Sequence, residues 1–211
     1  MRSRVFLWIL LSILAEPGLV WAADPGTSPV AITAVPPLEL RYIQYGVALT
    51  AEVVTAPGPI CGSNGAPCIL GSGGGIAGRG GIRFPGAWYF GGSYEFSKQD
   101  PSQLYRLAIL QQLRAEGRYY FVTSRATEPY LSATAGAFAY GNAWAVDLWG
   151  PMASLGAGVE FQITRTRVIG IGMTYRLLYT TPFTDSANTH RDAGIAQILG
   201  IDIVLEARDP L

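Results

Sequence analysis

The chain has 211 residues, and its 15 lysines and arginines balance its 15 aspartates and glutamates, so the formal net charge is zero. Only 14% of the residues are charged, against about 25% in an ordinary soluble domain. The sequence has no basic excess or basic stripe, which excludes a nucleic-acid-binding module. Its hydrophobic content of 49% excludes a disordered chain. With 26 glycines, the composition indicates a single apolar, glycine-rich domain.

Residues 1–22 have the pattern of a secretory signal peptide. Arg2 and Arg4 precede an almost wholly apolar stretch over residues 5–15, and small residues before the bond that follows Ala22 suit cleavage there. That stretch is too short for a transmembrane helix, which needs about 20 residues. We therefore expect an exported protein whose mature chain begins at Ala23, with a flexible proline-rich extension over residues 23–37.

The chain has two cysteines, Cys61 and Cys68, separated by a short segment rich in glycine, asparagine and proline. In an exported protein this pair predicts a disulfide that closes a loop; two free thiols are the alternative. A metal site is not expected, because the sequence has no other cysteine and its one histidine, His190, lies far along the chain.

From residue 38 onward, apolar residues alternate with small or polar ones, which is typical of β-strands. In residues 152–163, for example, Leu155 and Phe161 fall on one face and Ser154 and Glu160 on the other. Counting such segments predicts eight strands, at about 38–54, 70–83, 87–97, 103–121, 130–141, 152–163, 168–180 and 194–207. The composition of residues 103–117 also suits a helix, but their charged residues share one parity, which favours a strand.

The segments that connect these strands alternate in length. Those at 55–69, 142–151 and 181–193 are long or polar, and those at 84–86, 122–129 and 164–167 are short; the short gap after the third strand is the exception. Alternating segments of about 10 residues, with long loops at one end and short turns at the other, are typical of outer-membrane β-barrels. We therefore predict an all-β fold, an eight-stranded antiparallel up-and-down transmembrane β-barrel over residues 38–207. The lack of an apolar helix of about 20 residues excludes a helical inner-membrane protein.

The two faces of such strands have different roles. A sheet in lipid must close, and eight strands leave an interior that side chains fill. The apolar parity then faces lipid, with aromatic residues such as Trp88, Tyr119 and Phe161 near the strand ends. The small or polar parity faces the lumen, where buried charges must pair. We expect a lumenal network of ion pairs and hydrogen bonds made by Arg79, Arg83, Glu95, Arg106, Arg114, Glu116, Glu160, Arg176 and Asp202. Two further residues of this parity, Arg118 and Glu206, are expected at the barrel ends, in water.

No motif in the sequence has the context that catalysis or cofactor binding needs. Residues 73–78 match G-x-G-x-x-G, but no suitable strand precedes them and no long helix follows, so a dinucleotide site is not expected. His190 lies near Ser186 and Asp185 in a polar loop, and a catalytic triad is recognised by geometry rather than spacing. We therefore expect no catalytic residue, no cofactor and no bound metal.

Three segments resemble a known family: RYYF at residues 118–121, PYLSATAG at 129–136 and SLGAGVEF at 154–161. They are similar to the strands of the small eight-stranded outer-membrane β-barrel proteins of Gram-negative bacteria, of the OmpA/OmpX-like type, and the resemblance extends over residues 38–207. It implies a location in the bacterial outer membrane and insertion by the outer-membrane assembly machinery, which favours a C-terminal aromatic residue. This chain ends at Leu211 without one.

The sequence therefore predicts a non-enzymatic outer-membrane β-barrel that contacts outer-membrane lipid and has a structural or surface-interaction role through its extracellular loops. Three alternatives stay open. The barrel could be a narrow passive pore for small solutes, a lipid-modifying enzyme that uses His190, or a soluble secreted lipocalin-like barrel whose apolar parity faces inward.

Overall fold

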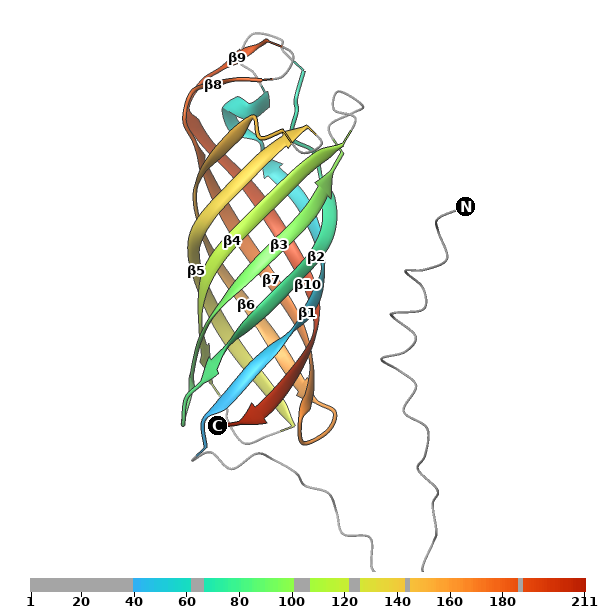
Figure 1. Cartoon of the computed structure of the whole chain (residues 1–211), viewed down its shortest axis with the longest axis vertical. Coiled ribbons are helices and arrows are strands. Elements are labelled where there is room, and N and C mark those ends of the chain that lie inside the picture. Colours follow the sequence, from blue (N-terminus) through green and yellow to red (C-terminus); the bar gives the residue numbers. More distant parts are fainter. Residues whose placement is uncertain (1–39, 62–66, 101–106, 122–125, 143–144, 186–187) are drawn as a thin grey trace, which may run out of the picture. The chain divides into compact units, whose positions relative to one another are not determined.

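The computed structural model describes residues 40–61, 67–100, 107–121, 126–142, 145–185 and 188–211 (Figure 1). The predicted signal peptide at 1–22 and the extension at 23–37 lie outside these residues. No helix among the described residues has the length and apolar character to span a membrane.

Eight long strands form one closed barrel in which every neighbouring pair is antiparallel, in the order β1-β10-β7-β6-β5-β4-β3-β2. The strands are β1 (Tyr42–Ala56), β2 (Gly73–Arg83), β3 (Trp88–Gln99), β4 (Ala108–Tyr120), β5 (Thr127–Asn142), β6 (Leu148–Gln162), β7 (Arg167–Thr180) and β10 (Gly194–Pro210). This architecture confirms the predicted fold class. Because the sheet closes on itself, no strand edge is left unpaired.

The pairing register shows that the strands are tilted. The partners of Tyr45, followed once around the barrel, lead back to β1 at Ala56 rather than at Tyr45. The displacement from position 45 to position 56 is eleven residues, one of which belongs to the irregularity between Val54 and Ala56. Such a stagger goes with strands inclined to the barrel axis.

Three predicted boundaries need correction. Residues 148–151 belong to β6 rather than to a loop, because they continue the alternation, with Trp149 exposed and Leu148 buried. The last strand continues beyond residue 207 to Pro210, since Arg208 keeps the inward parity. The fourth strand is described from Ala108, and residues 101–106 lie outside the described part. The helix considered for residues 103–117 is wrong where the chain is described, because Ala108–Tyr120 is a strand.

The two ends of the barrel differ (Figure 1). One end, here called the loop end, carries the one-turn 3-10 helix η1 (Gly58–Cys61) and a small hairpin of β8 (Phe183–Thr184) and β9 (His190–Arg191). The opposite end, here called the turn end, carries the connections β2–β3, β4–β5 and β6–β7, together with the start of β1 and the end of β10. The connections β1–β2, β3–β4 and β7–β10 at the loop end are longer than every connection at the turn end, but the long connection predicted at 142–151 is reduced to residues 143–147. Long loops are extracellular in outer-membrane barrels.

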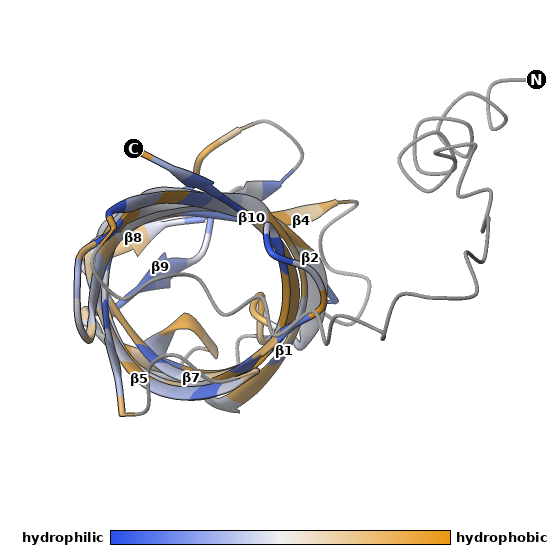
Figure 2. Ribbon diagram, turned by 90° about the horizontal axis from the view of Figure 1, so that it is seen from below, coloured by the Kyte–Doolittle hydropathy of each residue, from blue (hydrophilic) through white to orange (hydrophobic). Residues whose placement is uncertain are grey.

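The outer surface of the barrel is apolar. Leu155 is 70% exposed, Leu49 66% and Ile76 62%, and each belongs to the apolar parity of its strand. Figure 2 shows apolar and polar residues alternating along the strands. The soluble lipocalin-like alternative placed the apolar parity inside the barrel and is therefore wrong on this point. An apolar outer band is what a barrel surrounded by lipid requires.

Candidate functional site

The lumen contains a fully buried guanidinium at the centre of three carboxylates. Arg118, on β4, is 1% exposed. Its nitrogens lie 2.7 Å from a carboxylate oxygen of Glu160, 2.8 Å from one of Glu116 and 3.3 Å from one of Glu206. These partners come from β6, β4 and β10, so one side chain joins strands on different sides of the barrel. A buried charge is stable only when it is paired and hydrogen-bonded in this way.

Tyrosine rings surround this centre. The guanidinium carbon of Arg118 lies 4.6 Å from the ring centroid of Tyr89 and 5.2 Å from that of Tyr130, within the range of a cation–π contact. The Tyr120 hydroxyl donates a hydrogen bond to Glu160 at 2.7 Å, and the Arg83 guanidinium lies 3.9 Å from the Tyr120 ring centroid. The aromatic rings fill the space that the ion pairs leave.

The network extends from Glu160 to the turn end. Arg208 donates hydrogen bonds to Glu160 at 2.5 Å and to Glu128 at 3.1 Å. Arg83 holds the same Glu128 with two bonds, at 2.6 and 3.0 Å. Gln44 donates to Glu206 at 2.5 Å and accepts from Arg208 at 3.1 Å. These polar side chains therefore link β1, β2, β5, β6 and β10 across the interior.

A second group of charges lies nearer the loop end. Arg176 donates to Glu52 at 2.5 Å and to Glu95 at 3.1 Å, and Arg114 donates to Glu95 at 2.5 Å. Gln99 and Gln112 both donate to Glu52, at 2.5 and 2.8 Å. Between the two groups, Arg79 pairs with Asp202 at 3.0 Å and lies 3.6 Å from Glu206.

Each of these lumenal charges has an oppositely charged partner. The described lumenal ion pairs involve six arginines and seven carboxylates, namely Arg79, Arg83, Arg114, Arg118, Arg176 and Arg208 with Glu52, Glu95, Glu116, Glu128, Glu160, Asp202 and Glu206. The near balance limits the energetic cost of burying charge in so narrow a space.

The loop end is closed by apolar residues instead. Ile60, Ile69 and Leu70, from the connection between β1 and β2, are buried among inward side chains of the barrel wall: Leu110, Phe138, Tyr140, Leu148, Met152, Leu178 and Ile198. The expectation that the inward parity is small or polar is therefore wrong near the loop end. The cause is the inserted connection, which supplies an apolar partner for inward residues that would otherwise meet water. We call the described residues of this connection, 57–61 and 67–70, the cap.

Polar contacts hold the cap in place. Cys61 and Cys68 form the predicted disulfide. Arg191, from β9, is 2% exposed; it donates hydrogen bonds to the backbone carbonyls of Ile60 and Pro67 and pairs with Asp185 at 2.8 Å. The guanidinium thus satisfies the carbonyl of buried Ile60 and also bonds that of Pro67, which stabilises the inserted loop.

The structure brings together eight of the nine residues predicted for the lumenal network: Arg79, Arg83, Glu95, Arg114, Glu116, Glu160, Arg176 and Asp202. Arg106 lies outside the described residues. The expectation that Arg118 and Glu206 lie in water at the barrel ends is wrong, because both are buried and paired with each other. The tilt of the strands places these positions inside the barrel although they lie near strand ends in the sequence.

Sequence reasoning missed three charged members of the network. Glu52 has the inward parity of β1, which the alternation alone could have revealed. Glu128 and Arg208 fell just outside the predicted strands at 130–141 and 194–207, and the structure places both in strands. Extending the alternation by a few residues would have assigned both of them to the lumen.

The motifs considered for chemistry lie apart from this network. Residues 73–78 are part of strand β2, so the glycine-rich match opens no helix. His190 is exposed and pairs with Thr184 in the β8–β9 hairpin, and Ser186 lies outside the described residues. Across the part of the chain that the structure describes, no group of three histidine, cysteine or acidic side chains could hold a metal ion.

Comparison with known proteins identifies the fold. No protein-family model matches the sequence, and no curated protein matches it. Among solved structures, Neisserial surface protein A is similar, with a TM-score of 0.54 and 18% identity over 79% of this chain and 96% of that one. The outer membrane protein OprG of Pseudomonas aeruginosa has a TM-score of 0.49 and 13% identity over 81% and 96% of the two chains. For the Escherichia coli outer membrane protein W the TM-score is 0.44 and the sequence identity 13%, over 81% of this chain and 98% of that one.

The chain therefore has the fold of the small eight-stranded outer-membrane β-barrels, as the resemblance of its strands implies.

Proposed function

We propose that this chain is a non-enzymatic protein of the bacterial outer membrane whose filled lumen passes no solute and whose loop end interacts with partners outside the cell. The observation that supports this most directly is that two kinds of side chain fill the interior: ion pairs along the lumen and apolar residues of the cap at the loop end. A barrel closed in this way offers its outer band to lipid and its loops to the cell exterior. The similar Neisserial structure is also that of a surface protein.

Membrane location is tested by fractionating cells that produce the full chain and by gel mobility before and after boiling. A folded barrel resists detergent without heating, so we expect a mobility shift in the outer-membrane fraction. N-terminal sequencing of the same band tests cleavage after Ala22. A soluble chain without the shift would contradict the proposal.

The closed lumen is tested by single-channel recording of the purified chain in planar bilayers. We expect no steps of the size of an open porin, because six arginines and seven carboxylates occupy the interior. Conductance steps that persist at steady voltage would favour the passive pore instead.

The lipid-modifying enzyme is tested by comparing the membrane lipid composition of cells that carry H190A with that of wild-type cells. We expect no difference between them.

A further inference from the structure

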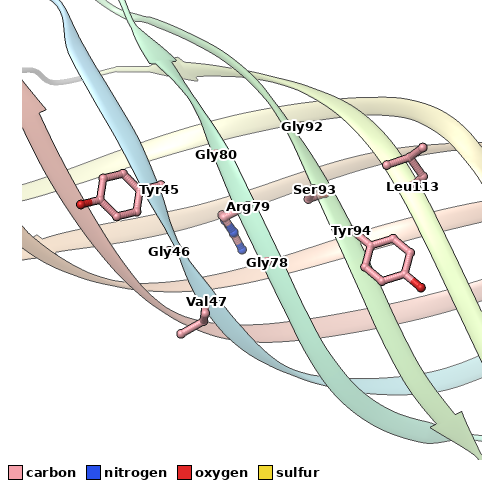
Figure 3. A pocket seen from close by; sticks show the side chains of 10 residues that line it. All are labelled: Tyr45, Gly46, Val47, Gly78, Arg79, Gly80, Gly92, Ser93, Tyr94 and Leu113. Atoms are coloured by element: carbon pink, nitrogen blue, oxygen red, sulfur yellow. The ribbon is translucent and has the colours of Figure 1, made fainter. Parts of the chain in front are cut away.

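A groove of about 510 Å³ lies on the outer surface of the barrel, over strands β1 to β4 (Figure 3). Its apolar lining includes three glycines of outward parity and four larger outward side chains: Gly78, Gly80 and Gly92, with Tyr45, Val47, Tyr94 and Leu113. The larger side chains are between 47% and 64% exposed, so they stand out from the wall around the glycines.

Packing of the barrel does not require Gly78 or Gly80. An added Cβ at Gly78 would meet nothing within 4 Å, and one at Gly80 would meet only the Tyr45 Cβ at an ordinary 3.7 Å. By contrast, a Cβ at the inward-facing Gly81 would lie 2.4 Å from the carbonyl oxygen of Phe90. Larger residues could therefore occupy the two outward positions, and their absence leaves a depression in the surface that faces lipid.

The groove begins close to the aromatic residues that mark the turn end of the apolar band. Trp88 stacks on Phe90 with ring centroids 5.7 Å apart, and its edge meets Tyr119 at 5.0 Å. Tyr45 pairs with Gly80 in the register of β1 and β2. Aromatic girdles of this kind lie at the membrane interface, so the groove occupies the half of the band on the turn side, the side of the periplasm.

An exposed cation, Arg41, lies on the turn side of the groove, just before the start of β1. The guanidinium carbon of Arg41 is 5.7 Å from the ring centroid of Phe84. Arg41 is four residues before Tyr45 on one side, and Phe84 is four residues after Gly80 on the other, a separation of about 13 Å along the strands. The headgroup layer on each side of a bilayer is about 5–8 Å thick, so a tilted strand of this length reaches from the groove into it.

We propose that the groove binds one anionic phospholipid of the periplasmic leaflet, with an acyl chain along the glycines and the phosphate at Arg41. This inference rests on the proposed membrane location. The backbone of Arg41 is held by the Leu211 N–H at 2.9 Å, and the nearby acidic Asp209 accepts a hydrogen bond from the Tyr45 hydroxyl at 2.9 Å.

Native mass spectrometry of the full chain in mild detergent, with equal amounts of phosphatidylglycerol and phosphatidylcholine of the same acyl chains, tests the site. We expect one phosphatidylglycerol adduct, favoured about fivefold, the factor that one basic residue near a membrane surface supplies. R41Q should remove the preference between headgroups. G80L should fill the groove and lower binding of both lipids.

Two matched variants serve as controls. R165Q removes an exposed arginine in the β6–β7 turn, which strand β10 separates from β1, and A133L enlarges an exposed small residue on β5, on the opposite side of the barrel from β1. Both should leave the adduct unchanged. A folded chain without the preference, or an equal loss in R165Q, would overturn the lipid site alone. A dimer that G80L abolishes would assign the groove to a second copy and overturn it too. A chain without a heat-dependent mobility shift would overturn the proposed membrane location, and the lipid site with it.

Discussion

Arg118 shows how one residue can determine the interior of this barrel. Its guanidinium is held by Glu116, Glu160 and Glu206 and lies against two tyrosine rings. The hydrogen bonds and rings replace the water that the charge loses on burial, so the side chain stabilises the fold only as long as its partners stay in place. Loss of the guanidinium would leave several carboxylates close together without compensation.

R118A should therefore lower the free energy of unfolding by about 3–5 kcal/mol, the range expected when one member of a buried ion pair is removed. The measurement is denaturant unfolding in lipid vesicles, followed by gel mobility. R165A, which removes an exposed arginine in the β6–β7 turn, is the control and should change stability by no more than about 0.5 kcal/mol. Equal small losses in the two variants would show that the network does not stabilise the barrel.

At the scale of the strands, alternation was enough to predict the barrel but not the depth of its residues. A period of two tells which face a side chain takes, and this identified inward residues such as Arg79, Glu160 and Asp202. The height of a residue along the lumen depends on strand tilt and register, which sequence alternation does not contain, so Arg118 and Glu206 were misplaced. The apolar cap could not be predicted either. Near the start of β10, Ile198 and Leu199 are both apolar, so alternation does not show that Ile198 faces inward, toward the cap.

Close approach of neighbouring strands at inward glycines gives a second prediction. A Cβ at Gly136 would lie 2.0 Å from the carbonyl oxygen of Leu113, a backbone atom that cannot rotate away. G136A should lower the free energy of unfolding by about 1–3 kcal/mol. G78A, whose Cβ meets nothing within 4 Å, should be neutral or stabilising by up to about 1 kcal/mol. The same denaturant titration compares the two, and the reverse order would contradict the packing described here.

The cap behaves as a separate element held by Arg191. R191A should leave the buried carbonyl of Ile60 without its donor, at a cost of about 1–3 kcal/mol, and also remove the bond to Pro67. We expect proteases to cleave within residues 57–70 of the variant while the barrel strands stay protected. H190A changes the exposed neighbour on the same strand and should resist cleavage as the wild type does. Equal protection of both variants would show that Arg191 does not hold the cap.

At the scale of the whole molecule, composition and architecture explain each other. The low content of charge follows from an outer band that faces lipid, and the near balance of arginines and carboxylates follows from a narrow interior in which each charge needs a partner. The apolar residues that a soluble protein keeps in its core are here divided. Most lie on the outer surface, and a smaller group, including Ile60 and Leu178, closes the loop end.

The outer band gives the last prediction. Leu155 is 70% exposed on β6, well inside the apolar band. In a bilayer L155R should lower the free energy of unfolding by about 2–4 kcal/mol, because a cation near the midplane of a barrel loses its hydration. V146R places the same side chain at a 55% exposed site in the β5–β6 connection and should change stability by no more than about 0.5 kcal/mol. Denaturant unfolding in lipid vesicles measures both. If L155R were as stable as V146R, the exposed leucines and isoleucines of this barrel would face water, and the lumenal charges would belong to a soluble protein.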